Sequence, residues 1–265
     1  MVERQLRRYH VVFDGQEVAG YIQERQAGQI RRMRGIPVLA IVRQGSSAAT
    51  NVYLRVKRLY GEELGVDVRC YTETPETLLE RIRELNADPE ITGINVELPF
   101  EDAPELTEAA LAEVALEKDV DGLAPNTPYD PATPKAIWWL LSAYNIELKG
   151  KKIAVVGQGR LVGAPISAQF EAAGHEVIRI DDTIDDLAAE LITADIIISS
   201  TGVPGLITSS MVQPGAVVID TGSPRSDLSE DLRARTDVKC SPNPGGIGPV
   251  TVAALYENLL FAAGA

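Results

Sequence analysis

Residues 149–165, KGKKIAVVGQGRLVGAP, constrain the fold more than any other stretch of this chain. A short apolar run at residues 153–156 breaks at a glycine turn and resumes as a segment compatible with a helix. A buried parallel strand that leads through such a turn into a helix N-terminus can bind phosphate through backbone N–H groups and the helix dipole. The third glycine, Gly163, comes one residue later than in the common dinucleotide fingerprint, so the motif alone leaves a purely structural turn open.

The remaining sequence alternates apolar runs with helical patterns, which indicates an α/β fold with parallel sheets. In the first half we expect strands at 37–43, 67–71 and 91–98, and helices at 14–34, 51–64, 75–85 and 104–116. In the second half we expect strands at 152–156, 176–180, 195–200 and 216–220, and helices at 133–144, 162–173, 184–191 and 249–261. Strands of the second half end in small residues or Asp, and open parallel sheets bind ligands beyond their carboxyl ends. The second half is therefore expected to bind a nucleotide.

Proline and glycine are densest at residues 118–135, which marks the expected domain boundary. A chain of 265 residues is long enough for two modest domains or one large one. We expect the first domain at residues 1–130 and a Rossmann-like, dinucleotide-binding domain at 131–248.

The net charge of −13 argues against nucleic acid or an anionic membrane as a partner, since both attract surplus Lys and Arg. Cys70 and Cys240 fit no metal-binding or redox spacing, so we expect two buried free thiols. With only His10 and His175, a histidine metal site or a Ser-His-Asp triad is disfavoured, and we expect no metal. The charged N-terminus MVERQLRRYH resembles no signal peptide and no long apolar run follows, which predicts a cytoplasmic protein.

Asp181 and Asp182 follow the strand at 176–180, about two dozen residues after Gly157. An acidic residue at that place in a dinucleotide fold bonds the ribose hydroxyls and repels a 2′-phosphate. The pair therefore favours NAD over NADP. A helix N-cap is the alternative role for an Asp at this position.

Four residues of the first half form a candidate proton-handling set: Tyr53, Lys57, Glu97 and Asp121. Tyr53 and Lys57 are four residues apart and share a helix face. Glu97 ends an expected strand, and Asp121 lies in a loop before the domain boundary. Singly, each residue fits a solvated charge or a structural hydrogen bond; together they could converge on one site.

Several segments resemble, in order, the motifs of the methylenetetrahydrofolate dehydrogenase/cyclohydrolase family of the FolD type. GINVELP at 93–99 is similar to the family's GILVQLP, KDVDG at 118–122 matches KDVDG, and PNPGGIGPVT at 242–251 resembles PVPGGVGPMT. Further matches are DGQEVA at 14–19, YLRVK at 53–57, TPK at 133–135 and GQGRLVGAP at 157–165.

The resemblance implies a folate cleft between an N-terminal catalytic domain and a nicotinamide-binding domain. It implies that the last helix, within residues 249–265, packs back on the first domain and that the protein is a homodimer. The implied reaction transfers a hydride from 5,10-methylenetetrahydrofolate to the nicotinamide. The resulting methenyl cation is then hydrolysed to 10-formyltetrahydrofolate.

By position, the resemblance makes Lys57 the proton-handling residue, lets Tyr53 position the folate and lets Asp121 bond the pterin. The loop at 244–248 would line the cleft through Pro244, Gly245, Gly246 and Gly248. The implied cofactor contacts, with the two Asp residues discussed above, are Gly157, Gln158, Gly159, Arg160, Gly163, Asp181, Asp182, Thr201, Gly202, Gly222 and Ser223.

The chain departs from the family pattern at five places. Glu97 stands where the family has Gln; a carboxylate beside Lys57 would hold the lysine charged, which would disfavour the cyclohydrolase step more than hydride transfer. Gly159 replaces the Ser of GRS, and the acidic pair replaces basic residues, which agrees with NAD. Ala124 replaces the His of the family's HP pair, and the segment between Thr221 and Cys240 is short and altered. A substrate-shifted NAD-dependent homologue and a non-catalytic dinucleotide-binding module stay open as alternatives.

Overall fold

The computed structural model describes residues 13–45, 48–100 and 102–264, and they form two compact units. The first unit contains the described residues up to Val18 together with Thr133–Val250; the second contains Ala19–Ala132 together with the described residues from Thr251. The N-terminal segment behind the cytoplasmic prediction, with His10, lies outside the described residues. That prediction, like the functional assignment of the two domains, stays a prediction.

The second unit is built on a three-stranded parallel sheet with the order β2-β1-β3. Its strands are β1 (Val38–Gln44), β2 (Asp67–Glu73) and β3 (Gly93–Glu97). Ile41 of β1 lies opposite Cys70 of β2 and Asn95 of β3. The central strand is a near-continuous apolar run because it is buried on both faces, as parallel sheets require.

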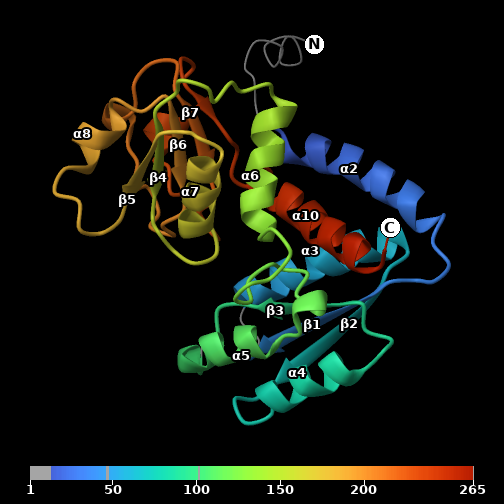
Figure 1. The fold of residues 1–265 in the computed structure, drawn as a ribbon. Helices are drawn as coiled ribbons and strands as arrows, with labels where there is room; N and C mark the ends of the chain where they lie inside the picture. The colour runs from blue at the N-terminus through green and yellow to red at the C-terminus, as the bar shows by residue number, and fades with distance from the viewer. Residues whose placement is uncertain (1–12, 46–47, 101, 265) are drawn as a thin grey trace. The chain divides into compact units, whose positions relative to one another are not determined.

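Helices cover both faces of this sheet (Figure 1). On one face, α4 (Leu78–Ala87) and α5 (Thr107–Glu113) close a core that includes Val42, Ile82 and Ile94. On the other face lie α3 (Ala48–Leu64) and the part of α10 (Ile247–Ala262) that belongs to this unit. A Cβ on Gly93 would lie 2.8 Å from the Leu259 side chain, so the sheet approaches α10 closely at this glycine.

The first unit is built on a five-stranded parallel sheet with the order β5-β4-β6-β7-β8, which Figure 1 shows with α7 and α8 beside it. Its strands are β4 (Ile153–Val156), β5 (Val177–Ile180), β6 (Ile196–Ser199), β7 (Val217–Asp220) and β8 (Lys239–Cys240). Chain order reverses between β4 and β6, and ligands of doubly wound sheets bind at the carboxyl end of such a switch point. The expected α/β fold with two parallel sheets is confirmed.

The helices beside this sheet in the first unit include α6 (Ala132–Ala143), α7 (Gly163–Ala172) and α8 (Leu187–Leu191). The first residue of α6, Ala132, is assigned to the second unit and the rest of the helix to the first. Trp138 of α6 packs edge-on against Phe170 of α7, with ring centroids 4.7 Å apart, and its indole N–H donates to Gln169. Residues 13–18 also belong to this unit and include the start of α2 (Gly15–Ile30). Asp14 Oδ1 accepts the backbone N–H groups of Gln16 and Glu17 and so caps α2.

Several expected boundaries were wrong. The single helix expected at 104–116 is a 3₁₀ turn (Pro104–Leu106), α5 and a second 3₁₀ turn (Leu116–Lys118). α8 begins only at Leu187, because Asp186 accepts the N–H of Ala189 and caps the helix there. The sequence did not reveal β8 or α9 (Glu230–Arg233), since two- and four-residue elements carry no periodic signal.

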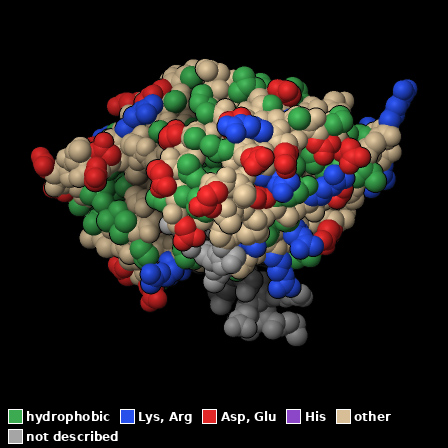
Figure 2. Space-filling model, turned by 90° about the horizontal axis from the view of Figure 1, so that it is seen from below, with side chains coloured by type: hydrophobic (Ala, Val, Ile, Leu, Met, Phe, Trp, Pro, Cys, Tyr) green, Lys and Arg blue, Asp and Glu red, His purple; other side chains and the backbone are tan. Residues whose placement is uncertain are grey.

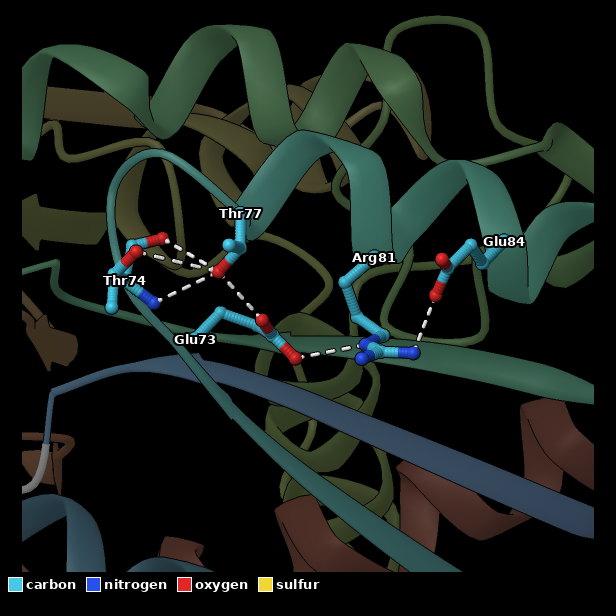
Figure 3. A network of polar contacts seen from close by, with 5 residues as sticks. All are labelled: Glu73, Thr74, Thr77, Arg81 and Glu84. Carbon is cyan, nitrogen blue, oxygen red and sulfur yellow. Dashed lines mark hydrogen bonds and ion pairs between the residues drawn. The ribbon is translucent and has the colours of Figure 1, made fainter.

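Pro75 was expected in the first turn of a helix but precedes α4, which begins at Leu78. Figure 3 shows the side chains at this helix start. Thr77 Oγ1 accepts the N–H of Thr74 and donates to Glu73 at 2.7 Å, while Arg81 Nε donates to the other Glu73 oxygen at 2.8 Å. The Glu73 carboxylate therefore anchors the end of β2 to the first turn of α4.

Both cysteines are free, but neither is fully buried as expected. Cys70 is exposed because β2 is an edge strand of the three-stranded sheet. Cys240 is half-buried on β8, which is an edge strand of the five-stranded sheet. Within the described ranges, no helix is long and apolar enough to cross a membrane, and no cluster of His, Cys, Asp or Glu could hold a metal. Acidic and basic side chains are interspersed on the face drawn in Figure 2.

Candidate active site and cofactor site

Lys57 and Tyr53 lie one turn apart on α3, in the second unit. The hydroxyl of the buried Tyr256, from α10, donates to the backbone carbonyl of Lys57 at 2.7 Å. Gly61 leaves room for this contact, since a Cβ there would lie 2.3 Å from the Tyr256 oxygen. α10 therefore fixes the backbone of α3 at Lys57, whereas the Tyr53 side chain is 38% exposed.

The Lys57 side chain points at two residues of β3. Its Nζ donates to Glu97 Oε2 at 2.6 Å and to Asn95 Oδ1 at 2.8 Å. The Lys57 and Glu97 side chains are only 12% and 7% exposed, so this is a nearly buried ion pair. Such a pair is held by geometry and additional hydrogen bonds rather than by surface Coulomb attraction alone.

Asn95 extends the chain of contacts to Asp121. Its Nδ2 donates to Asp121 Oδ2 at 2.5 Å, and the Asn95 side chain is fully buried. The structure therefore brings together the four residues expected from the sequence in one unit, and Asn95 joins two of them, Lys57 and Asp121. Sequence reasoning missed Asn95, although the period-two alternation of β3 places it on the same face as Glu97.

Burial and the charges of this cluster together shift the pKa values of Lys57 and Asp121. Burial lowers the pKa of Lys57, but the charges of Glu97 and Asp121 outweigh it, so the pKa is raised above its ordinary value. Burial raises the pKa of Asp121 to about 6, against the opposing charge of Lys57 and with the help of Glu97. Burial also raises the pKa of Asp119, whose carboxylate accepts the N–H of Ala124 at 2.8 Å.

This arrangement keeps Lys57 a cation. An ammonium has three N–H donors and no acceptor, and Glu97 and Asn95 take two of the donors. One donor is left for a ligand, and the amine lone pair that a base needs is absent while the proton stays bound. The site is therefore suited to orienting a substrate and stabilising negative charge, and poorly suited to taking a proton.

In the first unit, β4 ends in the glycine turn at residues 157–159. Gly157 has a φ of +85°, and a Cβ there would lie 2.6 Å from the Ser200 carbonyl oxygen. A Cβ on Gly163 would lie 1.7 Å from the Gly157 oxygen, so α7 starts in contact with the end of β4. Gln158 folds back to donate to the Val155 carbonyl, while Gly159 and Arg160 are exposed at the tip.

The geometry of the glycine turn is suited to binding a phosphate group. It sits at the carboxyl end of β4, next to the switch point, and leads into the N-terminus of a ten-residue helix. A Cβ on Gly159 would meet nothing within 4 Å, so the turn is open on its outer side. The residues present therefore fit a dinucleotide.

Asp181 and Asp182 follow β5, next to β4 in the sheet, and both are exposed. Asp181 Oδ1 accepts the backbone N–H and the hydroxyl of Thr183, at 3.0 and 2.6 Å. These bonds lower the pKa of Asp181. The N-cap alternative is not what the structure has, because α8 is capped by Asp186.

The other expected cofactor residues gather at the ends of β6 and β7, around a residue that the sequence did not single out. Buried Asp227 accepts the hydroxyl of Ser199 at 2.7 Å and the N–H of Thr201 at 2.8 Å. A Cβ on Gly222 would lie 2.4 Å from Asp227 Oδ1. Asp227 lies in the altered segment 221–240, so no motif pointed to it. Gly202 and Ser223 are exposed beside this cluster.

The loop at 244–248 is fixed within the first unit. Asn243 Nδ2 donates to the Gly222 carbonyl at 2.6 Å and to Asp220 Oδ2 at 3.1 Å. The Gly15 N–H donates to Gly245 at 2.9 Å, and a Cβ on Gly15 would lie 1.6 Å from the Gly246 oxygen. Pro244 is exposed, and Gly248 lies in the first turn of α10. The structure thus joins this loop to the Gly222 turn.

Comparisons with known proteins cover both units. Residues 13–121 match the family model of the tetrahydrofolate dehydrogenase/cyclohydrolase catalytic domain, and residues 131–265 match the model of its NAD(P)-binding domain. A protein of Moorella thermoacetica named bifunctional protein FolD is 36% identical over 275 residues, which are 95% of this chain and 98% of that protein.

Solved structures agree with these matches. The bifunctional FolD enzyme of Campylobacter jejuni superposes with a TM-score of 0.88 at 30% identity, over 96% of this chain and 99% of that one. The FolD enzyme of Trypanosoma brucei, solved with NADP and an inhibitor, superposes with a TM-score of 0.88 at 29% identity, over 96% and 97% of the two chains.

Proposed function

The chain belongs to the tetrahydrofolate dehydrogenase/cyclohydrolase family, as its motifs indicated, and on this premise we propose that it is a methylenetetrahydrofolate dehydrogenase that prefers NAD and has a weak cyclohydrolase activity. It is a one-carbon folate enzyme with an NAD(P)-binding domain. The observation that carries the finer proposal is the nearly buried contact between Lys57 and Glu97.

In this proposal the second unit binds the folate. Asp121 accepts N–H groups of the pterin ring through its carboxylate, and Tyr53 holds the ring system from the exposed face of α3. Fixed side chains of this kind supply orientation, which a hydride transfer needs more than it needs an acid or a base.

The glycine turn, Asp181 and the Gly222 turn would hold the nicotinamide dinucleotide, which supplies a hydride acceptor when bound. One hydrogen leaves the methylene bridge with its electron pair, and the folate becomes the methenyl cation. This hydride transfer does not require Lys57 to lose its proton. The raised pKa of Lys57 therefore leaves the dehydrogenase reaction intact.

Hydrolysis of the methenyl cation differs, because a water must lose a proton as it adds to the one-carbon bridge. Lys57 is the residue that the family resemblance assigns to this proton, and its pKa is raised. Glu97 Oε2 is already bonded to the Lys57 ammonium at 2.6 Å. We therefore expect slow hydrolysis.

NAD preference rests on Asp181 and Asp182. The carboxylates stand at the end of β5, where a dinucleotide fold meets the adenosine ribose. Asp181 keeps its charge, since its pKa is lowered, and would bond ribose hydroxyls while repelling a 2′-phosphate. No basic residue occupies positions 181–186, DDTIDD.

The test supplies methylenetetrahydrofolate with either NAD or NADP and follows the absorbance of the reduced nicotinamide. We expect turnover with both cofactors and a higher kcat/KM with NAD. Cofactor binding without reduction would overturn the dehydrogenase proposal and favour a non-catalytic dinucleotide-binding module. A higher kcat/KM with NADP would overturn only the NAD preference argued from Asp181 and Asp182, and the dehydrogenase proposal would stand.

We also propose that the protein is a homodimer, as the family resemblance implies. Light scattering coupled to size exclusion would give twice the 28.6 kDa chain mass if this is right. A monomer at assay concentration would contradict it.

A further inference from the structure

Asn95 lies between the cation and the carboxylate of the candidate active site. Its Oδ1 accepts from Lys57 Nζ at 2.8 Å, and its Nδ2 donates to Asp121 Oδ2 at 2.5 Å. We propose that Asn95 is a positioning residue that joins Lys57 and Asp121 into one hydrogen-bonded unit and sets the orientation of the Asp121 carboxylate toward the substrate.

The chemistry of the three groups permits only one orientation of the amide. An ammonium only donates hydrogen bonds, so it must face the amide oxygen; an ionised carboxylate only accepts, so it must face the amide nitrogen. Asn95 has both ends within bonding distance of the correct partner. A leucine of similar size would leave Lys57 and Asp121 without these bonds inside the protein, which is costly for charged groups.

The position of Asn95 in β3 makes the bridge rigid. β3 pairs in parallel with β1, and Asn95 lies opposite Ile41 in the register. Its neighbours Ile94 and Val96 are buried in the core on the opposite face of the sheet, under α4 and α5. The backbone of Asn95 is held by the pairing of β3 with β1, and its fully buried side chain has no room to turn away.

A second departure from the family motif, at Glu97 in the same strand, supports a joint role of Asn95 and Glu97. The segment GINVELP differs from the family motif GILVQLP at two positions that share one face of the strand: Asn95 in place of Leu, and Glu97 in place of Gln. Both new side chains bond Lys57. The two changes together place a carboxylate and an amide on the same ammonium.

Asn95 also influences the charge of Asp121. Asp121 faces Lys57 from α3, Glu97 from β3 and Asp119 from its own loop, and burial is the largest cause of its raised pKa. The hydrogen bond from Asn95 acts in the opposite direction and favours the charged carboxylate. An ionised Asp121 can accept N–H groups of a substrate, whereas a protonated one loses part of that capacity.

The role in catalysis rests on the proposed function, but the bridge itself can be tested without substrate. We would follow the Asp121 carboxyl carbon by NMR against pH, in protein labelled with ¹³C-aspartate, for the parent protein and for Asn95→Leu. The resonance is assigned with Asp121→Asn. We expect the midpoint of the Asp121 titration to rise in Asn95→Leu, since the bond that favours the carboxylate is lost.

Asn95→Asp gives a second variant of nearly the same shape, in case the leucine variant does not fold. It keeps an acceptor for Lys57 but has no donor for Asp121, so the Asp121 midpoint should rise here too. The matched control is Asn86→Leu: Asn86 also bridges two groups, the Glu113 carbonyl and the Ala115 N–H, far from Lys57 along α4 and α5. Asn86→Leu should lower thermal stability and leave the Asp121 midpoint unchanged.

Kinetics supply the second readout. For Asn95→Leu we expect kcat/KM of the dehydrogenase reaction to fall roughly tenfold at neutral pH, with its acidic limb moved to higher pH along with the Asp121 midpoint. Asn86→Leu should keep the parent pH profile. An unchanged Asp121 midpoint in both Asn95 variants would overturn the proposal. A shifted midpoint in a protein that reduces neither cofactor would support the bridge and overturn only the proposed function.

Discussion

The Nζ atom of Lys57 lies 2.6 Å from Oε2 of Glu97, and the two side chains are 12% and 7% exposed. The contact joins α3 to the carboxyl end of β3. A cation held this way by a carboxylate, with an amide as second acceptor, stays protonated across the physiological range. The proposed division between hydride transfer and a slow hydrolysis step rests on this one pair.

Glu97→Gln should raise the rate of methenyltetrahydrofolate hydrolysis by roughly tenfold or more, the scale of a restored proton-transfer group. The amide removes the charge that raises the pKa of Lys57, so a larger fraction of the lysine can exchange a proton. The decay of methenyltetrahydrofolate absorbance measures the rate. Fast hydrolysis in the parent protein, or no gain in the variant, would refute the charge argument.

Lys57→Met should destabilise the protein by about 3–5 kcal/mol, because it leaves the nearly buried Glu97 without its cation. Urea unfolding at neutral pH would measure the loss. The double variant Lys57→Met with Glu97→Gln should recover part of that stability, since it removes the unpaired carboxylate. Equal stability of the parent and the single variant would contradict this prediction, because it would mean that water solvates the unpaired carboxylate as well as Lys57 stabilises it.

Asp121→Asn should change how stability depends on pH. Burial raises the pKa of Asp121 from 3.8 to about 6, so the folded state binds this proton more tightly than the unfolded state does. The contribution of Asp121 to stability is therefore best at low pH and declines as the pH rises from 3.8 to about 6. Unfolding free energies measured across this interval should show that decline in the parent protein and lack it in Asp121→Asn. Parallel curves would contradict it.

Asp181→Ser should shift cofactor preference toward NADP. A carboxylate and a phosphate a few ångströms apart repel by about 1 kcal/mol or more at a hydrated surface, which is roughly a fivefold change in relative kcat/KM. Serine can still accept the N–H of Thr183, so the turn is kept. Asp185→Ser is the control, an exposed carboxylate in the same loop. The same change in both variants would point to net charge instead of the ribose contact.

Gly163→Ala should abolish the glycine-turn geometry. The new Cβ would lie 1.7 Å from the Gly157 oxygen, a backbone atom that can move only if β4 and α7 separate. We expect a loss of stability of at least about 1–3 kcal/mol and weak NAD binding, measured by thermal unfolding and by calorimetry. Gly28→Ala in α2 is the control, because its nearest neighbour is the flexible Arg31 side chain at 3.8 Å. That variant should be neutral or slightly more stable.

Much of the fold was predictable because its signals are local. The buried strands are continuous apolar runs, and β4 is followed by a glycine turn whose conformation only glycine readily adopts. Boundaries were less predictable where side chains compete for the helix start, as Thr77 does by bonding Glu73. Cys70 was placed wrongly because its exposure depends on β2 being an edge strand, which no local pattern reports.

The sequence by itself determined the two parallel-sheet units, the family, and the residue types at the strand ends, because each depends on periodicity or on a short motif. Only the tertiary structure decided what Lys57 touches. Its partners Asn95 and Glu97 are 38 and 40 residues away along the chain, and Asp121 joins them through Asn95. A hydrogen bond depends on distances of tenths of an ångström between segments that only folding brings together. The charge state of the central lysine is therefore a property of the fold.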